Sequence, residues 1–410
     1  MDVVFERCAG LDVHKETVVA CVRTAGSNRR ERRGEVRTFS TVSRGLAELC
    51  AWLESEHVTH AAMESTGVYW RPVYAALEGP FELLLVNARH IKGVPGRKTD
   101  VRDCEWLAQL LECGLLRGSF VPPQAVRDLR DLTRFRKTLV RERGHQVNRI
   151  AKTLELASIK LSSVATDIMG KTGRAILEAL IAGNDDPEQL AQLAQGLLKK
   201  KTEQLREALT GRMRPHYAFL LQQQIKLIDA LDTQIKELDA RIEACMGPFA
   251  EAYERLQTVP GVRARAAQCL LAEIGADMSR FPSAAQLASW ARVCPGNHES
   301  AGKRQPVSTG QGNTWLRGTL QEVAWAAART KRSYYCALFQ RLRARRGAKK
   351  AIVAVQHSLL VAIWHMLRDS LTHEDLGADY FERHNKARIC RHHVRRLQQL
   401  GYSVAIQEAA

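Results

Sequence analysis

The sequence lacks a long apolar segment: no uninterrupted apolar run reaches about 18 residues, the length that suggests a membrane-spanning helix. Hydrophobic residues nevertheless make up 45% of the 410 residues, which is ordinary for a globular protein. A leader with a basic start, an apolar centre and small residues is also missing from the first residues. We therefore expect a cytoplasmic protein of two or three domains that has no membrane partner.

Paired cysteines are absent as well. The ten cysteines are scattered along the chain, and none forms a Cys-x-x-Cys pair. Cys390, His392 and His393 lie close together in sequence, but a second pair of ligands at the spacing of a zinc site is missing. Neither a structural zinc site nor a disulfide framework is expected, and most cysteines should behave as small core residues.

Acidic residues are in deficit, because 44 Asp and Glu face 61 Lys and Arg, which gives a formal net charge of +17. Such an excess of basic residues in a chain without membrane segments is typical of proteins that bind nucleic acids.

Two acids lie at the start of a predicted helix that follows Gly96. Apolar residues at 101, 104, 107, 108, 110 and 111 share one helix face, and Thr99 is the expected N-cap. Asp100 and Asp103 then occupy the first turn, where their like charges repel unless a cation lies between them. Nearby basic residues would suit a phosphate backbone that approaches a metal held by these acids: Arg97, Lys98 and Arg102. An ordinary acidic first turn is the alternative.

Two more acids end predicted strands. Asp12 closes the apolar strand 8–13, and Glu64 closes the strand 58–64. Further strands are expected at 17–23, 36–42 and 81–87, with helices at 46–56 and 68–77, an order that predicts a mixed sheet flanked by helices. Acids from two strand ends and one helix start then converge at one sheet edge, where four carboxylates suit two Mg²⁺ or Mn²⁺ ions. A turn-forming role is the alternative for Asp12.

The chain from residue 124 onward is predicted to be mostly helical. A long helix over 124–160 carries basic side chains that suit a nucleic-acid backbone, although a merely solvated face remains open: Arg127, Arg130, Arg134, Arg136, Lys137, Arg141, Arg143 and Arg149. Within a helical stretch over 185–247, apolar residues recur in steps of three and four, as in a coiled coil: Ile228, Leu231, Ile235, Leu238 and Ile242. Dimerisation and packing within one bundle both fit this short seam.

A second domain is expected from residue 258, where the turn 258–262 suggests a helix-hairpin-helix with Arg263 and Arg265 on a phosphate. A simple helix start with Pro at its first position is the alternative. The basic turn 341–350, which contains Arg345 and Arg346, is a further candidate for phosphate binding. The polar loop 294–304 contains Ser300, and its residues alone indicate no more than an ordinary loop.

Three short sequence motifs resemble those of the DEDD (RuvC-like) insertion-sequence transposases, the bridge-RNA-guided serine recombinases. The catalytic fold of that family is similar to ribonuclease H. Residues 10–15 read Gly-Leu-Asp-Val-His-Lys, residues 63–70 read Met-Glu-Ser-Thr-Gly-Val-Tyr-Trp, and residues 96–103 read Gly-Arg-Lys-Thr-Asp-Val-Arg-Asp. The resemblance implies Mg²⁺ or Mn²⁺ on Asp12, Glu64, Asp100 and Asp103. Cys104 stands where such sequences have a small residue.

The same resemblance extends to the second half of the chain. It implies that Ser300 is the nucleophile, in a loop that also carries Lys303 and Arg304, and that Asn313 and Arg317 face nucleic acid. Ala301 departs from the family pattern, which has Gly directly after the serine. The implied domains are a catalytic domain over 1–123, a basic helix and coiled coil over 124–257, a transposase domain with a helix-hairpin-helix over 258–375, and a basic tail over 376–410.

The implied function is site-specific transposition of DNA by a homodimer or homotetramer guided by an RNA from the element, in association with the nucleoid. The four acids alone fit equally a metal-dependent nuclease of the Holliday-junction-resolving type, which uses water as nucleophile. A nucleic-acid-binding protein without catalytic activity is a second alternative.

Overall fold

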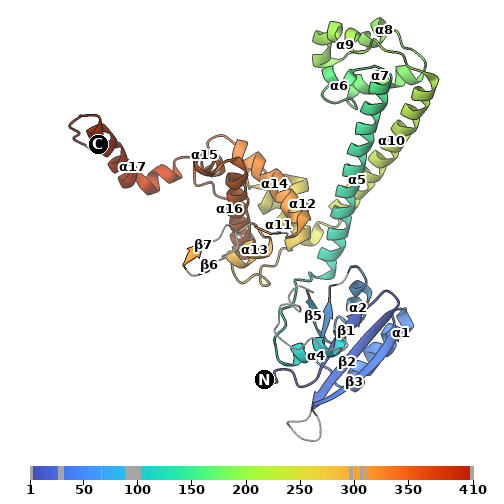
Figure 1. Cartoon of the computed structure of the whole chain (residues 1–410), viewed down its shortest axis with the longest axis vertical. Coiled ribbons are helices and arrows are strands. Elements are labelled where there is room, and N and C mark those ends of the chain that lie inside the picture. The colour runs from blue at the N-terminus through green and yellow to red at the C-terminus, as the bar shows by residue number, and fades with distance from the viewer. Residues whose placement is uncertain are drawn as a thin grey trace. The chain divides into compact units, whose positions relative to one another are not determined.

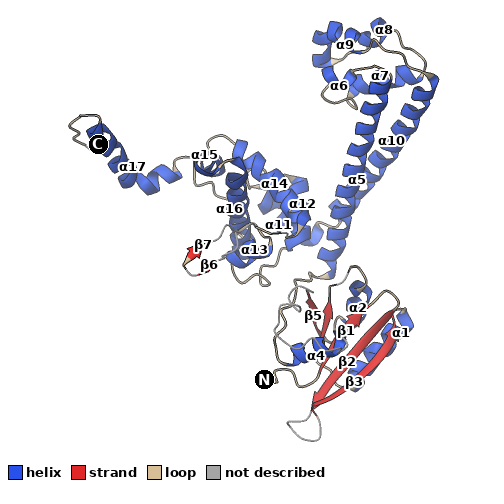
Figure 2. Ribbon diagram, viewed as in Figure 1, coloured by secondary structure: helices blue, strands red, loops and turns tan. Residues whose placement is uncertain are grey.

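The computed structural model describes residues 3–25, 32–65, 67–87, 103–294, 299–300, 302–304, 309–310 and 312–406, and at 299, 300, 303, 304 and 385 it describes the backbone alone. The chain divides into two compact units, Met1–Val121 and Pro122–Ala410. The first unit contains the large sheet, and the second is almost entirely helical (Figures 1 and 2).

The sheet of the first unit has five strands in the order β3-β2-β1-β4-β5. Strands β1 (Cys8–Val13), β2 (Thr17–Ala25) and β3 (Arg32–Ser40) are antiparallel neighbours. Strands β4 (His60–Glu64) and β5 (Glu82–Val86) continue the sheet in parallel with β1. The predicted mixed sheet with flanking helices is confirmed, and β3 begins earlier than expected because its pairing with β2 extends to Arg32.

Helices cover both faces of this sheet. On one face, α1 (Ser43–Ser55) and α2 (Trp70–Leu77) pack against alternate residues of β1 and β4, such as Leu11 and Met63. On the other face, α4 (Asp103–Glu112) packs against Cys8, Ala62 and Val86 through Leu107 and Leu111. Because successive strand residues point to opposite faces, residues 10 and 12 of β1 belong to the face that α4 covers.

The second unit begins with a long helical hairpin formed by α5 (Gln124–Leu156) and α10 (Pro215–Ala244). Between them, α6 (Leu161–Val164), α7 (Lys171–Ile181), α8 (Pro187–Gln192), η1 (Gly196–Lys201) and α9 (Thr202–Ala208) build a cluster at one end of the hairpin (Figure 1). Leu231 and Ile235 of the predicted seam pack against Leu139 of α5, and Ile228 joins the core of the cluster. The seam is therefore occupied within one chain.

The C-terminal helices surround α16 (Ala348–Asp369), which contacts α11 (Ala250–Gln257), α13 (Ala284–Trp290), α14 (Thr314–Arg329) and α15 (Tyr334–Arg346). By length and composition α16 could cross a membrane, but 56% of its apolar window is buried inside the protein. It is the core helix of this group. The remaining elements are η2 (Gly247–Phe249), α12 (Ala264–Ile274), β6 (Glu299–Ser300), β7 (Lys303–Arg304) and α17 (Tyr380–Gln399).

The adjacent residues Leu227 and Ile228 test how α10 packs. Ile228 is fully buried, so Ile228→Ala should lower the free energy of unfolding by about 2–5 kcal/mol. Leu227 is 45% exposed, and Leu227→Ala should change it by less than about 0.5 kcal/mol. Thermal unfolding at several protein concentrations measures both. A loss for Ile228→Ala that depends on protein concentration would contradict packing within one chain.

Candidate active site

Asp12 and Glu64 lie at neighbouring strand ends. Strands β1 and β4 pair in parallel, with Gly10 opposite Ala62 and Leu11 opposite Met63. The next residue on each strand is the acid, so the same register places Asp12 beside Glu64 on the face that α4 covers. Both side chains are half-buried. Two of the predicted acids thus come together through strand register alone.

Asp103 is brought to the same edge because α4 approaches β1 closely at Gly10. A Cβ atom at residue 10 would lie 2.2 Å from the carbonyl oxygen of Cys104 and 2.4 Å from the backbone nitrogen of Ala108, so only glycine fits there. Asp103 is the first residue of α4, where the helix dipole favours a carboxylate. Burial, followed by the charges of Glu105 and Asp12, raises the pKa of the Cys104 thiol to about 11.

The other end of α4 is held by a buried carboxylate. Glu112 accepts hydrogen bonds from Arg23 of β2, at 3.1 Å from Nε, and from Arg32 of β3. The side chain of Glu112 is only 4% exposed, and two guanidinium groups compensate the burial of its charge. Together with the contact at Gly10, this pairing fixes α4 along the sheet.

His14 also lies at this edge of the sheet, beside Asp12. The sequence analysis did not name it as a candidate, although it is part of the motif at residues 10–15. Its Nε2 lies 3.1 Å from Oδ2 of Asp12, and its backbone N–H donates to the carbonyl oxygen of Thr17, the first residue of β2. The available signal was the spacing of two residues, which places both side chains on one face of an extended chain.

The donor set suits a hard divalent cation. Asp12, Glu64 and Asp103 offer carboxylate oxygens, which Mg²⁺ and Mn²⁺ prefer. In the part of the chain that the structure describes, no three His, Cys, Asp or Glu side chains lie close enough together to hold a metal ion. Asp100 lies outside that part, as do the expected cap Thr99 and the basic residues Arg97, Lys98 and Arg102. The fourth ligand of the predicted set is therefore not placed.

Ser300 lies in a small hairpin of the second unit. Ser300 of β6 pairs with Lys303 of β7, and Gly302 in the turn between the two strands has a φ of +72°. The side chains of Ser300, Lys303 and Arg304 are outside the described set. At the base of this segment Gly312 packs on α13: a Cβ there would lie 2.9 Å from the carbonyl oxygen of Ala291. Residues 291 and 312 are thus in contact.

Comparison with known protein families shows which kind of protein has these features. Residues 9–159 match a family model of the DEDD and IS110 type described as "Transposase", and residues 253–338 match one described as "Transposase IS116/IS110/IS902 family". The two matches together span more than half of the chain, and they contain Asp12, Glu64, Asp103 and Ser300.

The chain belongs to the IS110 family of transposases.

A Sinorhizobium fredii protein named as a transposase, y4pF/y4sB, is 26% identical to this chain over 334 residues. The match covers 78% of this chain and 76% of the relative. This similarity extends over more of the chain than either family match.

Several arginines that the sequence predicts to bind nucleic acid are engaged by acids of the transposase itself. Glu273 of α12, whose side chain is 3% exposed, accepts two hydrogen bonds of 2.8 Å from Arg134. Arg130 donates to the backbone oxygens of Ala272 and Glu273, at 2.9 and 2.8 Å, and Asn313 donates to Glu273 at 2.5 Å. The structure thus gives Arg130, Arg134 and Asn313 a role in joining α5, α12 and the start of α14.

Asn313 also caps α14. Its Oδ1 accepts hydrogen bonds from the backbone N–H groups of Trp315 and Leu316, at 3.0 and 3.2 Å. A side-chain cap of this kind stabilises a helix start by about 1 kcal/mol. The other predicted contact of this segment, Arg317, donates to the backbone oxygen of Gly310 at 2.7 Å.

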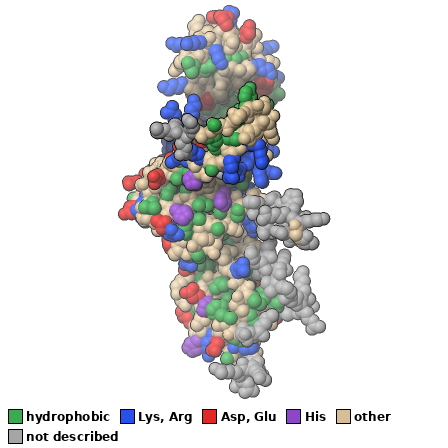
Figure 3. All heavy atoms as spheres, turned by 90° about the vertical axis from the view of Figure 1, so that its left-hand side faces the viewer, with side chains coloured by type: hydrophobic (Ala, Val, Ile, Leu, Met, Phe, Trp, Pro, Cys, Tyr) green, Lys and Arg blue, Asp and Glu red, His purple; other side chains and the backbone are tan. Residues whose placement is uncertain are grey.

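Other basic residues of α5 and α12 pair with α10. Arg136 and Arg265 both contact Asp239, and Arg143 pairs with Asp232. Arg127 donates to Gln124 one turn earlier on α5, and Arg263 is exposed. Lys and Arg side chains still gather in groups on the face drawn in Figure 3.

Two predicted phosphate-binding turns are present as turns. The turn between α11 and α12 contains Gly261, with a φ of +87°, where a Cβ would lie 2.7 Å from the carbonyl oxygen of Val323 in α14. The tip of this turn is therefore covered by α14. The turn at Gly347, between α15 and α16, is open, and its neighbours Arg345 and Arg346 are exposed. Phosphate binding by either turn remains a prediction.

The glycine at residue 10 can be tested against a glycine in β3. Gly10→Ala should lower the free energy of unfolding by about 1–3 kcal/mol and displace α4, because the added methyl overlaps backbone atoms. Gly34→Ala adds a methyl where no heavy atom lies within 4 Å, and it should be neutral. Chemical denaturation of both variants makes the comparison, and equal stabilities would contradict the close approach of α4.

Glu273 can be tested against Glu322, which also pairs with α5. Glu273→Gln leaves two guanidinium groups without their buried acid and should cost about 3–5 kcal/mol of folding stability. Glu322 is 73% exposed and pairs with Lys137, so Glu322→Gln should cost at most about 1 kcal/mol. Denaturant titrations give both values. A neutral Glu273→Gln would show that the network contributes nothing to the fold.

Proposed function

We propose that this transposase cleaves and rejoins DNA with Ser300 as the nucleophile and with a divalent metal held by Asp12, Glu64, Asp100 and Asp103. The observation that supports the proposal is that Asp12 and Glu64 end neighbouring parallel strands, and that α4, which begins at Asp103, packs closely on β1 at Gly10. Family membership supports the general activity, since transposases break and join DNA strands.

The acids would bind Mg²⁺ or Mn²⁺ through their oxygens. A metal bound there would neutralise developing charge on a phosphodiester and orient it for in-line attack. Oδ2 of Asp12 lies beside His14, and Oδ1 is the second oxygen that this carboxylate would offer to a cation. Arg97, Lys98 and Arg102 would then hold the neighbouring phosphates.

Ser300 would supply the attacking oxygen. Its Oγ forms a bond to phosphorus as it loses its proton, and the bond from phosphorus to the leaving sugar oxygen breaks as that oxygen takes up a proton. The phosphodiester is thereby conserved as a phosphoserine ester. Attack by a second strand reverses the step and rejoins DNA.

An RNA encoded by the element would select the DNA sites, which leaves phosphate and shape recognition to the protein. We propose a homodimer or homotetramer as the active form. Lys303, Arg304, Arg263, Arg345 and Arg346 are the proposed backbone contacts in the second unit.

The acid site predicts a complete loss of cleavage in Asp12→Asn, because a neutral amide binds a divalent cation far more weakly than a carboxylate. Nucleic-acid binding and folding should be unchanged. Asp185→Asn, which alters an exposed acid of the α7–α8 turn, is the matched control and should cleave normally. Cleavage of element DNA with Mg²⁺ and the transcribed element RNA measures both variants, and cleavage by Asp12→Asn at the wild-type rate would overturn the metal assignment.

The serine predicts a protein–DNA adduct that survives denaturation. Wild type should form this adduct, Ser300→Ala should not, and Ser289→Ala, in an exposed serine of α13, should form it normally. Denaturing gels with labelled DNA provide the readout. Cleavage without an adduct, unaffected by Ser300→Ala, would instead establish a nuclease that uses water.

A further inference from the structure

The C-terminal helix α17 concentrates basic charge. From Tyr380 to Gln399 it contains six basic residues against one acid, Glu382 in its first turn. No side chain of α17 that the structure describes is buried. An exposed helix with so little apolar packing gains little stability from the rest of the fold.

One end of α17 is fixed to the body of the second unit. Tyr334 of α15 contacts the rings of Tyr380 and Phe381, with centroids 5.2 and 5.3 Å apart, and Arg341 lies over Phe381 at 4.9 Å. The backbone nitrogen of Tyr334 also donates to Asp375. Beyond this contact α17 leads away from α15 and α16, as Figure 1 shows.

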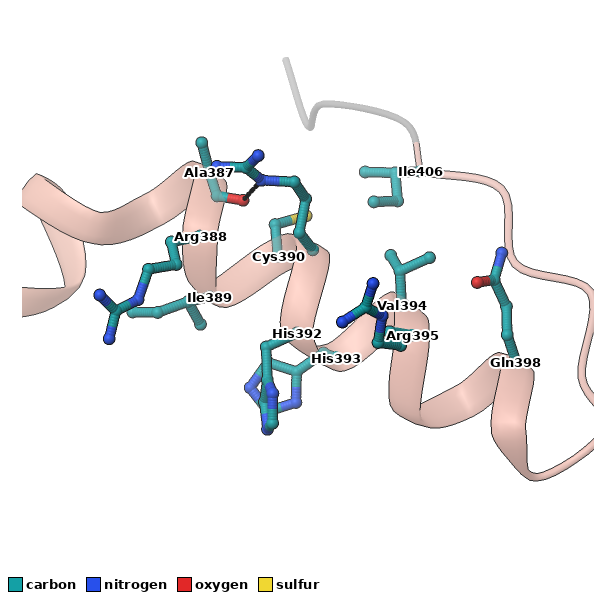
Figure 4. A pocket seen from close by; sticks show the side chains of 11 residues that line it. Ala387, Arg388, Ile389, Cys390, His392, His393, Val394, Arg395, Gln398 and Ile406 are labelled. Carbon is teal, nitrogen blue, oxygen red and sulfur yellow. Dashed lines mark hydrogen bonds between the residues drawn. The ribbon is translucent and has the colours of Figure 1, made fainter. Parts of the chain in front are cut away.

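The side chains of α17 separate into two stripes. Ala387, Cys390, Val394 and Leu397 follow one another in steps of three and four and form an apolar stripe. Ile406 of the returning tail lies on this side, opposite Cys390 and Val394 (Figure 4). Part of the apolar stripe, at Cys390 and Val394, thus faces Ile406.

The second stripe is basic, and its Arg391 donates to the backbone oxygen of Ala387 at 3.3 Å. Arg388, Arg391 and Arg395 also follow in steps of three and four, roughly 110° around the helix from the apolar stripe. Figure 4 shows Arg388, His392 and His393 projecting away from Ile406. Within the described residues, no carboxylate pairs with Arg388, Arg391 or Arg395, and all three are exposed.

The arginines of this basic stripe differ from those of α5 in having no acidic partner among the described residues. On α5, Arg134, Arg136 and Arg143 each pair with an acid of the same chain. Placing three cations along one helix face without acids costs electrostatic free energy that an anionic partner would recover. The surface therefore fits a partner with regularly spaced negative charge.

We infer that α17 is a DNA-binding helix whose basic stripe contacts the phosphates of duplex DNA. A helix of 20 residues is about 30 Å long, and the major groove of B-DNA admits an α-helix. The major groove of duplex RNA is too deep and narrow for such contacts, which favours DNA. This inference rests on the proposed function, because it takes DNA as the substrate.

The test removes three charges from α17 and compares a matched removal elsewhere. The full-length variant Arg388→Gln, Arg391→Gln, Arg395→Gln is set against Lys199→Gln, Lys200→Gln, Lys201→Gln, which alters three exposed lysines of η1. Fluorescence anisotropy with a labelled duplex of the element's end gives Kd over a range of salt concentrations. Circular dichroism checks that both variants fold.

The α17 variant should bind roughly tenfold or more weakly at low salt, and its slope of log affinity against log salt should be shallower by about 0.9 for each lost contact. The η1 variant should keep the wild-type slope. Replacing the same three arginines by lysine should restore binding, since lysine keeps the charge. Equal losses in the α17 and η1 variants, or a loss confined to duplex RNA, would overturn the inference.

The failure of this inference can be told apart from the failure of the proposed function. A wild-type protein that forms the Ser300 adduct, beside an α17 variant that binds duplex DNA normally, refutes only the role of α17. A wild-type protein that forms no adduct, beside an α17 variant with weakened DNA binding, refutes the serine chemistry and supports the role of α17.

Discussion

The close approach of a helix to a strand at Gly10 is the constraint on which the acid site depends. The backbone of α4 occupies the space that any side chain at residue 10 would need. Asp12 follows two residues later on the same face, and Asp103 precedes the carbonyl that touches Gly10. A larger residue at this position would separate the acids without altering any of them. The geometry of the site is therefore set by a residue that carries no functional group.

The positive charge of the transposase divides into two populations with different roles. Arginines of α5 and α12 are paired with buried or half-buried acids and hold helices together. Truncating one member of such a pair leaves an uncompensated charge, so these arginines matter to folding whatever they contact outside the protein. The arginines near Gly347 and along α17 are exposed and carry the electrostatic potential toward solution. Net charge alone does not distinguish these populations.

Much of the first unit could be predicted from the sequence, because its strands alternate or run apolar and end in acids or turns. The strand ends at Asp12 and Glu64 were read correctly for that reason, and the parallel register then followed from the fold. The fate of the arginines on α5 could not be predicted, since their partners Asp232, Asp239 and Glu273 lie about 90 to 140 residues away in the sequence. His14 was missed because a polar residue in a turn has an ordinary explanation.

The pairing of Arg130 and Arg134 with Glu273 has a mechanical consequence. Helix α5 extends about 33 Å beyond Arg134 before it ends at Leu156. Hydrogen bonds hold this part of α5 to α12 and, through Glu273, to the cap of α14. A tilt of the helix by about 5° at this point would move its far end by about 3 Å. Asn313 connects the carboxylate of Glu273 to the start of α14, beside Gly312, which packs on α13. The contacts of both Arg134 and Asn313 depend on one buried carboxylate, that of Glu273.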